Sequence, residues 1–314
     1  MRFGATLGKW LDMPVGSTRF TWRKFWADSA LAYTYLLPSL LIIGTFSLYP
    51  VLKAFYMSLN DWGIGPKGTF NGLENYLEIL TDKVFWQACK NTAIYVLGTI
   101  PVEITLALGL ATLLNRKLKG MAFWRLAYFT PYVTTSVAIS IVWAWIYHEQ
   151  YGVLNWIIGL FGVGPQPWLS DPRYTMFTII LMSVWRSLGY TTVIFLAGLQ
   201  NMDRELANAA RVDGATERQV FRHITWPLLS PTTFFVSITS IIGAFKVFTE
   251  IFVLYGGRPG PMNAGMTIVF YIYESAWVDK RMGYASAAAY VLFFMVLAVT
   301  VFQFWYARKR VHYS

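Results

Sequence analysis

Residues 207–231 read ANAARVDGATERQVFRHITWPLLSP. This polar stretch combines small alanines, charges of both signs and one Asp-Gly pair, and it interrupts a chain whose neighbouring segments are strongly apolar. The apolar segments on both sides are long enough to cross a bilayer, which takes about 20 residues in a helix. The stretch is therefore expected to lie in water or against a polar partner, between two membrane-spanning helices.

The composition of the whole chain is that of a membrane protein. Of its 314 residues, 56% are hydrophobic and 18% are aromatic, whereas only 13% are charged. These proportions and the lengths of the apolar segments predict an all-α, polytopic membrane protein with six transmembrane helices. The predicted spans are 29–52, 91–115, 126–147, 174–200, 224–257 and 282–307.

The segments that flank the spans are basic. Segment 1–28 carries no signal-peptide cleavage pattern, so it is expected to stay on the mature chain, either as an interfacial helix or as an unstructured tail. The spans form one domain, 29–307, with a long polar loop at 201–227, and a basic tail follows at 308–314.

The distribution of Lys and Arg predicts the orientation of the spans. Six spans place both termini on the same side as the loops near 115–125 and 201–223, and this side holds most of the 26 basic residues. By the positive-inside rule it is the cytoplasmic side. The formal charge of +10 is thus explained by topology and contact with anionic membrane lipid, and it does not indicate nucleic-acid binding.

Residue types that carry catalysis are sparse. A single cysteine, Cys89, excludes an internal disulfide, and His148, His223 and His312 are isolated in sequence. The chain has no zinc-protease motif, no nucleophile-elbow motif and no P-loop. We therefore expect no catalytic residues, no metal site and no cofactor on this chain, so that any ATP would be bound by another subunit.

The loop that contains most of residues 207–231 is predicted to form two short helices. Segment 202–212 favours a helix, with Asp203 as its N-cap. Gly214 is suited to end this helix, because glycine accepts a positive φ. Thr216 and Gln219 have the spacing of a capping box, which predicts that a second helix begins there.

Two interpretations of this loop are open. It could be an amphipathic hairpin that only connects two spans. The small side chains of Ala207, Ala209 and Ala210, however, would let the backbone of a partner come close, and loops that only connect are usually shorter. We therefore interpret the loop as a docking site.

The motif around this loop resembles the EAA loop of ABC importer permeases, the membrane subunits that dock on an ATPase. The resemblance is closest to the carbohydrate-uptake group of maltose and glycerol-phosphate permeases. It is carried by Ala209-Ala210, by Asp213-Gly214-Ala215, and by Phe221, Ile224, Pro227 and Leu228. Further matches are Gly72-Leu73-Glu74-Asn75-Tyr76, Phe85-Trp86, Asn91-Thr92 and Gly256-Gly257-Arg258-Pro259-Gly260.

The resemblance implies a type I ABC importer permease in a bacterial or archaeal cytoplasmic membrane. It implies as partners two ATP-binding cassette subunits that bind ATP and Mg²⁺, a second and different permease, and an extracytoplasmic solute-binding protein. The coupling residues it implies are Glu205, Asn208, Ala209, Ala210, Asp213, Gly214 and Ala215. Asn208 departs from the family, in which a Glu at this position is expected to pair with a basic residue of the ATPase; Glu205 lies close to one turn earlier and could partly substitute.

Polar residues inside two predicted spans suggest a substrate pathway. Thr239, Gly243, Lys246 and Glu250 have the spacing of one helical face, and Ser183, Arg186, Ser187 and Tyr190 repeat this on the preceding span. The resemblance adds that the sugar pocket of maltose-type permeases is built from these two spans. The candidate pathway residues are Arg186, Tyr190, Ser240, Gly243, Lys246 and Glu250.

Alternatives to this pathway remain open in the sequence. Lys246 and Glu250 could simply neutralise each other at a helix interface. A different class, an ion-coupled secondary transporter or channel, would use Glu103, Lys246 and Glu250 as a relay and predicts broken helices. Within the importer hypothesis, sugar, oligosaccharide, polyol and glycerol phosphate all remain possible substrates.

Overall fold

The structure is a computed structural model that describes residues 22–65, 67–115 and 120–310. The greater part of the predicted N-terminal segment and the end of the basic tail lie outside these ranges. The chain forms two compact units, residues 1–53 and 54–314, and each is described by itself. Helices dominate both units, as predicted.

The first unit is helical throughout its described part. It contains α2 (Trp22–Ile43), the π-helical turn η1 (Gly44–Leu48) and the beginning of α3 (Tyr49–Ser58). Between residues 33 and 52 every residue except Gly44 is exposed, and most of these residues are apolar. Such a surface is expected to face lipid, as in a transmembrane helix.

The second unit begins with small elements and then a long helix. Strands β1 (Asn60–Asp61) and β2 (Thr69–Phe70) pair antiparallel, and α4 (Glu74–Thr81) follows. The long helix α5 (Lys83–Leu114) starts where Asp82 caps it, because the Asp82 carboxylate accepts a hydrogen bond of 2.8 Å from the Val84 amide.

The remaining apolar segments include two that bend. Helix α6 (Met121–Val133) continues into α7 (Ser136–Ile146) through a bend of 110° between Leu126–Val133 and Ser136–Ile146. The segment Glu217–Leu228 meets α13 (Ser230–Ala244) at 62°. The straight spans are α9 (Pro172–Gln200) and α16 (Met282–Arg310). The shorter elements are α8 (Val153–Gly159), α10 (Arg204–Val212), α11 (Glu217–Val220), η2 (Phe221–Thr225), α12 (Trp226–Leu228), α14 (Thr249–Leu254), η3 (Pro261–Asn263), α15 (Ile268–Tyr273) and η4 (Glu274–Val278).

The number of spans agrees with the prediction. Among the described residues four helices are long and apolar enough to cross a membrane, and there are six candidate spans if each bent pair counts as one. The predicted boundaries shift by several residues, since the first span runs over Tyr33–Ser58 and the second over Lys83–Leu114. The predicted all-α, six-span architecture is therefore confirmed.

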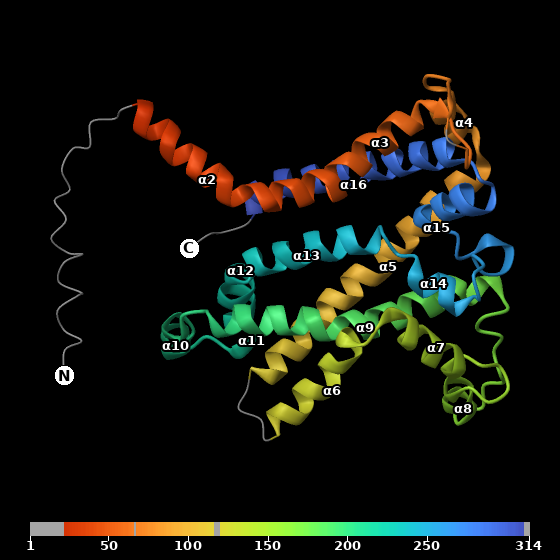
Figure 1. The fold of residues 1–314 in the computed structure, drawn as a ribbon. Helices are drawn as coiled ribbons and strands as arrows, with labels where there is room; N and C mark the ends of the chain where they lie inside the picture. Colours follow the sequence, from red (N-terminus) through yellow and green to blue (C-terminus); the bar gives the residue numbers. More distant parts are fainter. Residues whose placement is uncertain (1–21, 66, 116–119, 311–314) are drawn as a thin grey trace, which may run out of the picture. The chain divides into compact units, whose positions relative to one another are not determined.

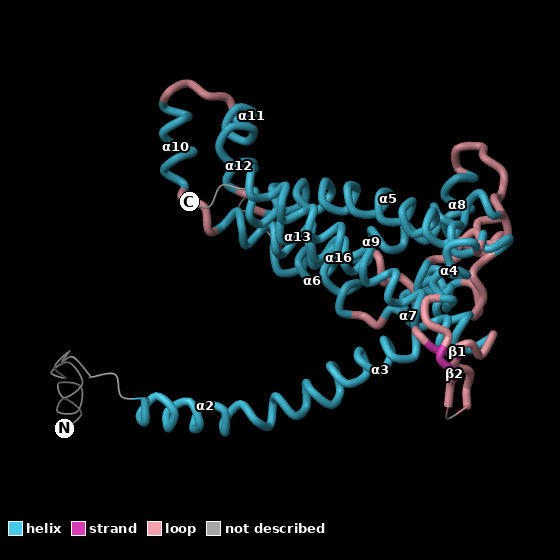
Figure 2. The backbone as a smooth tube through the Cα atoms, turned by 90° about the horizontal axis from the view of Figure 1, so that it is seen from above, coloured by secondary structure: helices cyan, strands magenta, loops and turns pink. Residues whose placement is uncertain are grey.

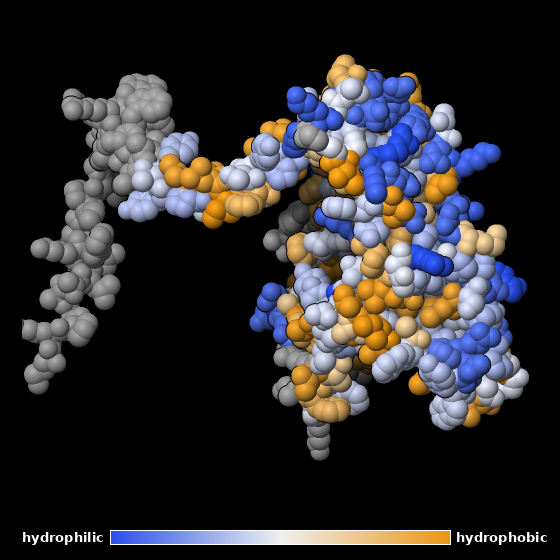
Figure 3. Space-filling view, turned by 45° about the vertical axis from the view of Figure 1, so that its right-hand side comes forward, coloured by the Kyte–Doolittle hydropathy of each residue, from blue (hydrophilic) through white to orange (hydrophobic). Residues whose placement is uncertain are grey.

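The core of the second unit lies where α5 packs along α9. One buried cluster joins these helices to α7, α14, α15 and α16, and a second joins their other halves to α13. Figures 1 and 2 show α10 and α11 at one end of these helices and α4, α8 and the β1–β2 pair at the opposite end. On the face seen in Figure 3, hydrophobic side chains form a patch on the body of this unit, with hydrophilic side chains around it.

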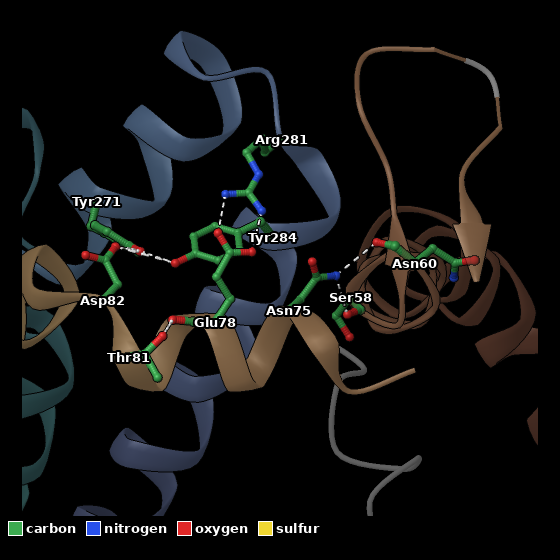
Figure 4. A network of polar contacts seen from close by, with 9 residues as sticks. All are labelled: Ser58, Asn60, Asn75, Glu78, Thr81, Asp82, Tyr271, Arg281 and Tyr284. Carbon is green, nitrogen blue, oxygen red and sulfur yellow. Dashed lines mark hydrogen bonds and ion pairs between the residues drawn. The ribbon is translucent and has the colours of Figure 1, made fainter. Parts of the chain in front are cut away.

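The end opposite α10 is held by a polar network (Figure 4). The Asn75 side chain donates hydrogen bonds of 3.0 Å to the backbone oxygens of both Ser58 and Asn60. Arg281 forms an ion pair with Glu78, and this hydrogen-bonded guanidinium lowers the pKa of the Glu78 carboxyl. The motif Gly72-Leu73-Glu74-Asn75-Tyr76 thus has a structural role, because it ties α4 to the end of α3.

Replacing Asn75 with alanine is expected to destabilise this end of the protein. The substitution leaves two backbone carbonyls without their donor, at a cost of about 1–3 kcal/mol in the free energy of unfolding. The measurement is the midpoint of thermal unfolding in detergent. Asn71→Ala is the matched control, since the buried Asn71 Oδ1 has no hydrogen-bond partner in the described part of the chain; equal shifts for the two variants would contradict this role.

Candidate functional site

A polar cavity lies between the helices of the second unit. Its volume is about 400 Å³, and it is lined by α5, α6, α9, α13 and the segment that leads into α14. All six candidate pathway residues line it: Arg186, Tyr190, Ser240, Gly243, Lys246 and Glu250. The structure therefore brings together the residues that the sequence analysis selected, while their role in transport stays a prediction.

The ion pair in this cavity joins two different helices. Arg186 Nη1 lies 3.1 Å from Glu250 Oε1, so the pair joins α9 to α14. The alternative in which Glu250 is neutralised by Lys246 on its own span is therefore wrong. Lys246 is exposed and has no ion-pair partner among the described residues.

The fifth predicted span is not one continuous helix. α13 ends at Ala244, and α14 begins only at Thr249, after Phe248 with φ −151° and ψ −58°. The prediction of one helical face is wrong because tertiary contacts hold the break: Thr267 Oγ1 donates to Val247 O at 3.0 Å, and the Phe248 ring packs between neighbouring aromatic rings. The polar residues on both sides of the break nevertheless line the same cavity.

Glu103 has partners that the sequence analysis did not identify. Its side chain on α5 is buried, and Oε1 accepts hydrogen bonds from Thr191 of α9 and from Ser240 of α13, the latter at 3.3 Å. One carboxylate thus connects three helices at the wall of the cavity. The sequence carries no signal for this connection, since Thr191 and Ser240 are distant from Glu103 along the chain.

Other lining residues were also missed. Tyr132 of α6 stacks on Tyr190, with ring centroids 4.7 Å apart and an angle of 16° between the planes. Thr99 also lines the cavity. Its hydroxyl is buried and has no partner with standard hydrogen-bond geometry in the described ranges, as is also true of Ser183, which the sequence analysis had placed on the polar face of its span. Thr99 lies four residues before Glu103, so the helical spacing on α5 is a signal that could have found it.

The loop at 201–227 forms the predicted helix, turn and second helix. Asp203 caps α10, because its carboxylate accepts a hydrogen bond of 2.8 Å from the Glu205 amide. Gly214 follows the helix with φ +86°. Both hydrogen bonds of the capping box between Thr216 and Gln219 are present. These three local predictions are confirmed, and we call α10, the Gly214 turn and α11 the coupling hairpin.

The surface of the coupling hairpin is partly apolar. Ala209 is exposed, as the docking interpretation requires, and Ala210 is half-buried. Leu206 and Val212 are 49% and 88% exposed, and the sequence analysis had not selected them. These two exposed apolar side chains lie on the same short helix as Ala209.

Charged side chains complete the hairpin. Arg211 forms an ion pair with Glu217, Nε to Oε1 at 2.7 Å, and its Nη1 donates to Asn208 Oδ1 at 2.9 Å. The hydrogen bond with Glu217 raises the pKa of Arg211 above its ordinary value. Glu205, Asp213 and Ala215 belong to the same hairpin, so all seven predicted coupling residues are close together.

Comparisons with known proteins agree with this architecture. The family described as "Binding-protein-dependent transport system inner membrane component" matches residues 103–311. The lactose transport system permease protein LacF of Rhizobium radiobacter is 35% identical over 281 residues, covering 88% of this chain and 94% of that protein. The arabinooligosaccharides transport system permease protein AraP of Bacillus subtilis is 36% identical over 292 residues, covering 92% of each chain.

A solved structure shares the fold. In the crystal structure of a bacterial alginate ABC transporter in complex with an alginate pentasaccharide-bound periplasmic protein, one chain is similar with a TM-score of 0.79. The similarity covers 91% of this chain and 96% of that chain, at 21% sequence identity. Together with the sequence matches over most of its length, this shows that the chain is a multi-pass membrane protein that belongs to the family of inner membrane components of binding-protein-dependent transport systems, the permeases of ABC importers.

Proposed function

We propose that this permease imports a sugar or a related polyol. The proposal rests on the cavity, where the buried hydroxyls of Thr99 and Ser183 lie beside the Tyr95 hydroxyl but have no partner with standard hydrogen-bond geometry among the described residues. A buried hydroxyl without a well-aligned partner is stabilised when a ligand or water pairs with it. A polyhydroxyl solute can donate to and accept from such groups, and the relatives named above transport lactose and arabinooligosaccharides.

The charges of the cavity favour a neutral solute. Arg186 and Lys246 are formally balanced by Glu103 and Glu250, so the lining offers no excess of positive charge to a phosphate. The guanidinium of Arg186 is also already paired with Glu250. Sugar or polyol is therefore favoured over glycerol phosphate.

The transport cycle needs partners, and the coupling hairpin is the proposed contact with the motor. Two ATP-binding cassette subunits would bind ATP and Mg²⁺, a second and different permease would complete the pathway, and a solute-binding protein would deliver the substrate. In this cycle ATP closes the two cassette subunits, and the hairpin moves with the cleft that holds it. The spans then turn the cavity outward toward the loaded binding protein, and hydrolysis of ATP returns the cavity inward.

Removal of one cavity hydroxyl tests the role of the cavity. Thr99→Val keeps the shape of the side chain and removes only its hydroxyl, so protein abundance is expected to stay normal. The KM of uptake is expected to rise roughly three- to tenfold, the effect of losing one neutral hydrogen bond to the substrate. The measurement is the dependence of uptake on substrate concentration.

Thr233→Val is the matched control for this prediction. The Thr233 hydroxyl is also buried without a partner in the described part of the chain, but Thr233 does not line the cavity. This variant is expected to take up substrate with an unchanged KM. A parallel change of KM in both variants would contradict a contact between Thr99 and the substrate.

One observation favours the alternative of an ion-coupled transporter. Broken helices are typical of that class, and the fifth segment is interrupted between α13 and α14. Copurification separates the two functions. If the chain is an importer permease, cassette ATPase subunits that are expressed in the same cell copurify with it. The double variant Ala209→Arg, Ala210→Arg is expected to abolish this copurification. A chain that binds no ATPase and still transports by itself would overturn the proposal.

A further inference from the structure

All three nitrogens of the Arg211 guanidinium donate hydrogen bonds within the coupling hairpin. Nε and Nη2 donate to the two oxygens of Glu217, at 2.7 and 3.2 Å, and Nη1 donates to Asn208 Oδ1 at 2.9 Å. The Glu217 contact is a two-point contact between planar groups, which fixes relative orientation better than a single point charge does. All three guanidinium nitrogens therefore have partners within the hairpin.

This contact spans the turn between two helices. Arg211 lies in the last turn of α10, and Glu217 is the first residue of α11. Between them the chain reverses at Gly214, where the Gly214 amide bonds to Arg211 O at 3.1 Å and the Ala215 amide bonds to Ala210 O at 2.9 Å. The backbone bonds close the turn, and the side-chain contact fixes the angle between α10 and α11.

Asn208 suits this arrangement because it accepts a hydrogen bond without adding a charge. A carboxylate at position 208 would compete with Glu217 for the same guanidinium. With Asn208 present, the charges of Arg211 and Glu217 cancel within the hairpin. The surface left for a partner combines the exposed apolar side chains of Leu206, Ala209 and Val212 with the exposed charged side chains of Glu205, Asp213 and Arg218.

We infer that Arg211 is a positioning residue of the coupling hairpin. Its contacts with Glu217 and Asn208 hold α10 and α11 at the angle at which the hairpin docks on a cassette subunit, and its guanidinium makes no ionic contact with the ATPase. This inference rests on the proposed function of the hairpin. It assigns to Asn208 a role inside the permease in place of one across the interface.

Exchange of the two charges tests the inference in the complex of permease and cassette subunits. Arg211→Glu and Glu217→Arg, made singly, each place two like charges side by side and are expected to weaken association with the ATPase roughly fivefold or more. The double variant restores the pair, and the Asn208 amide can then donate to the carboxylate at position 211. Its affinity is expected to return to within about twofold of the original chain.

Two results would overturn the internal role of Arg211. If Arg211 instead contacts a carboxylate of the ATPase, the double variant stays as defective as Arg211→Glu. If neither single variant weakens association, the internal pair does not position the hairpin. Arg222→Glu is the matched control, because Arg222 is an exposed arginine close to α11 with no ion pair in the described part of the chain, and the same change of charge there is expected to have little effect.

Association of the unmodified chain with the ATPase is measured first, at about 0.1 M NaCl, so that ionic contacts are not strongly screened. Absence of any association at low salt is a distinct outcome, which would remove the proposed function itself.

Discussion

Gly189→Ala is expected to lower ATP-driven uptake by tenfold or more, because it forces two helices of the cavity apart. A Cβ atom at Gly189 would clash with Tyr128 O and would lie 3.0 Å from Phe129 Cα. These are backbone atoms of α6, so the contact cannot be relieved by turning a side chain. Overpacking of this kind costs about 1–3 kcal/mol, or more where the backbone must move.

The displacement is expected to reach the cavity directly. Tyr190, the next residue on α9, stacks on Tyr132 of α6, and both rings line the cavity. The measurements are the melting temperature in detergent and the rate of uptake. Gly109→Ala is the matched control in another transmembrane helix, since nothing lies within 4 Å of its Cβ position; similar losses in both variants would contradict the close approach of α6 and α9.

Gly214→Val is expected to reduce association with the ATPase and uptake by about tenfold while the spans still insert normally. Gly214 has φ +86°, a conformation that costs an L-amino acid roughly 1–2 kcal/mol and more if it is β-branched. No atom lies within 4 Å of its Cβ position, so the penalty is purely conformational. A hairpin that avoids this conformation presents α10 and α11 at the wrong angle.

Gly214→Asn distinguishes an effect of the backbone conformation at position 214 from an effect of the size of the side chain. Asparagine tolerates a positive φ better than other residues, so this variant is expected to keep uptake within about twofold of the original. The measurements are copurification of the ATPase and the rate of uptake at saturating substrate. A defect as severe for Asn as for Val would show that added bulk, and not the backbone conformation, disturbs docking.

The sequence predicted those parts of the fold that depend on local chemistry. The lengths of the apolar segments predicted the six spans, and the caps at Asp203 and Thr216 predicted where α10 and α11 begin. These features depend on hydrophobicity and on hydrogen bonds between residues that are close in the chain. The same is true of the Gly214 turn.

The bend and the break were not predicted from the sequence. The bend between α6 and α7 lies at Thr134-Thr135, shortly after Pro131, and Thr135 caps α7, whereas the break after Ala244 contains Lys246. At the break the backbone is held by Thr267 and by the packing of Phe248, which are contacts between distant segments. Helical spacing therefore selected the correct cavity residues near the break but described their arrangement wrongly.

The partners of the charged residues in the cavity could not be predicted from the sequence either. Spacing on one helix suggested that Lys246 could pair with Glu250, whereas Glu250 pairs with Arg186 of another helix. Glu103, for which no partner was identified, binds hydroxyls of α9 and α13. Such pairs depend on which helices become neighbours, and a single sequence does not carry that information.

This chain is expected to move its substrate only when a cassette ATPase drives it. Uptake can be measured in lipid vesicles that contain the purified chain, its companion permease and the ATPase subunits, with the loaded binding protein outside and ATP inside. The substrate is the radiolabelled sugar that the binding protein retains. We expect accumulation that requires ATP and disappears when the ATPase subunits are omitted. Accumulation by the chain alone, driven by a proton or sodium gradient without ATP, would contradict this expectation.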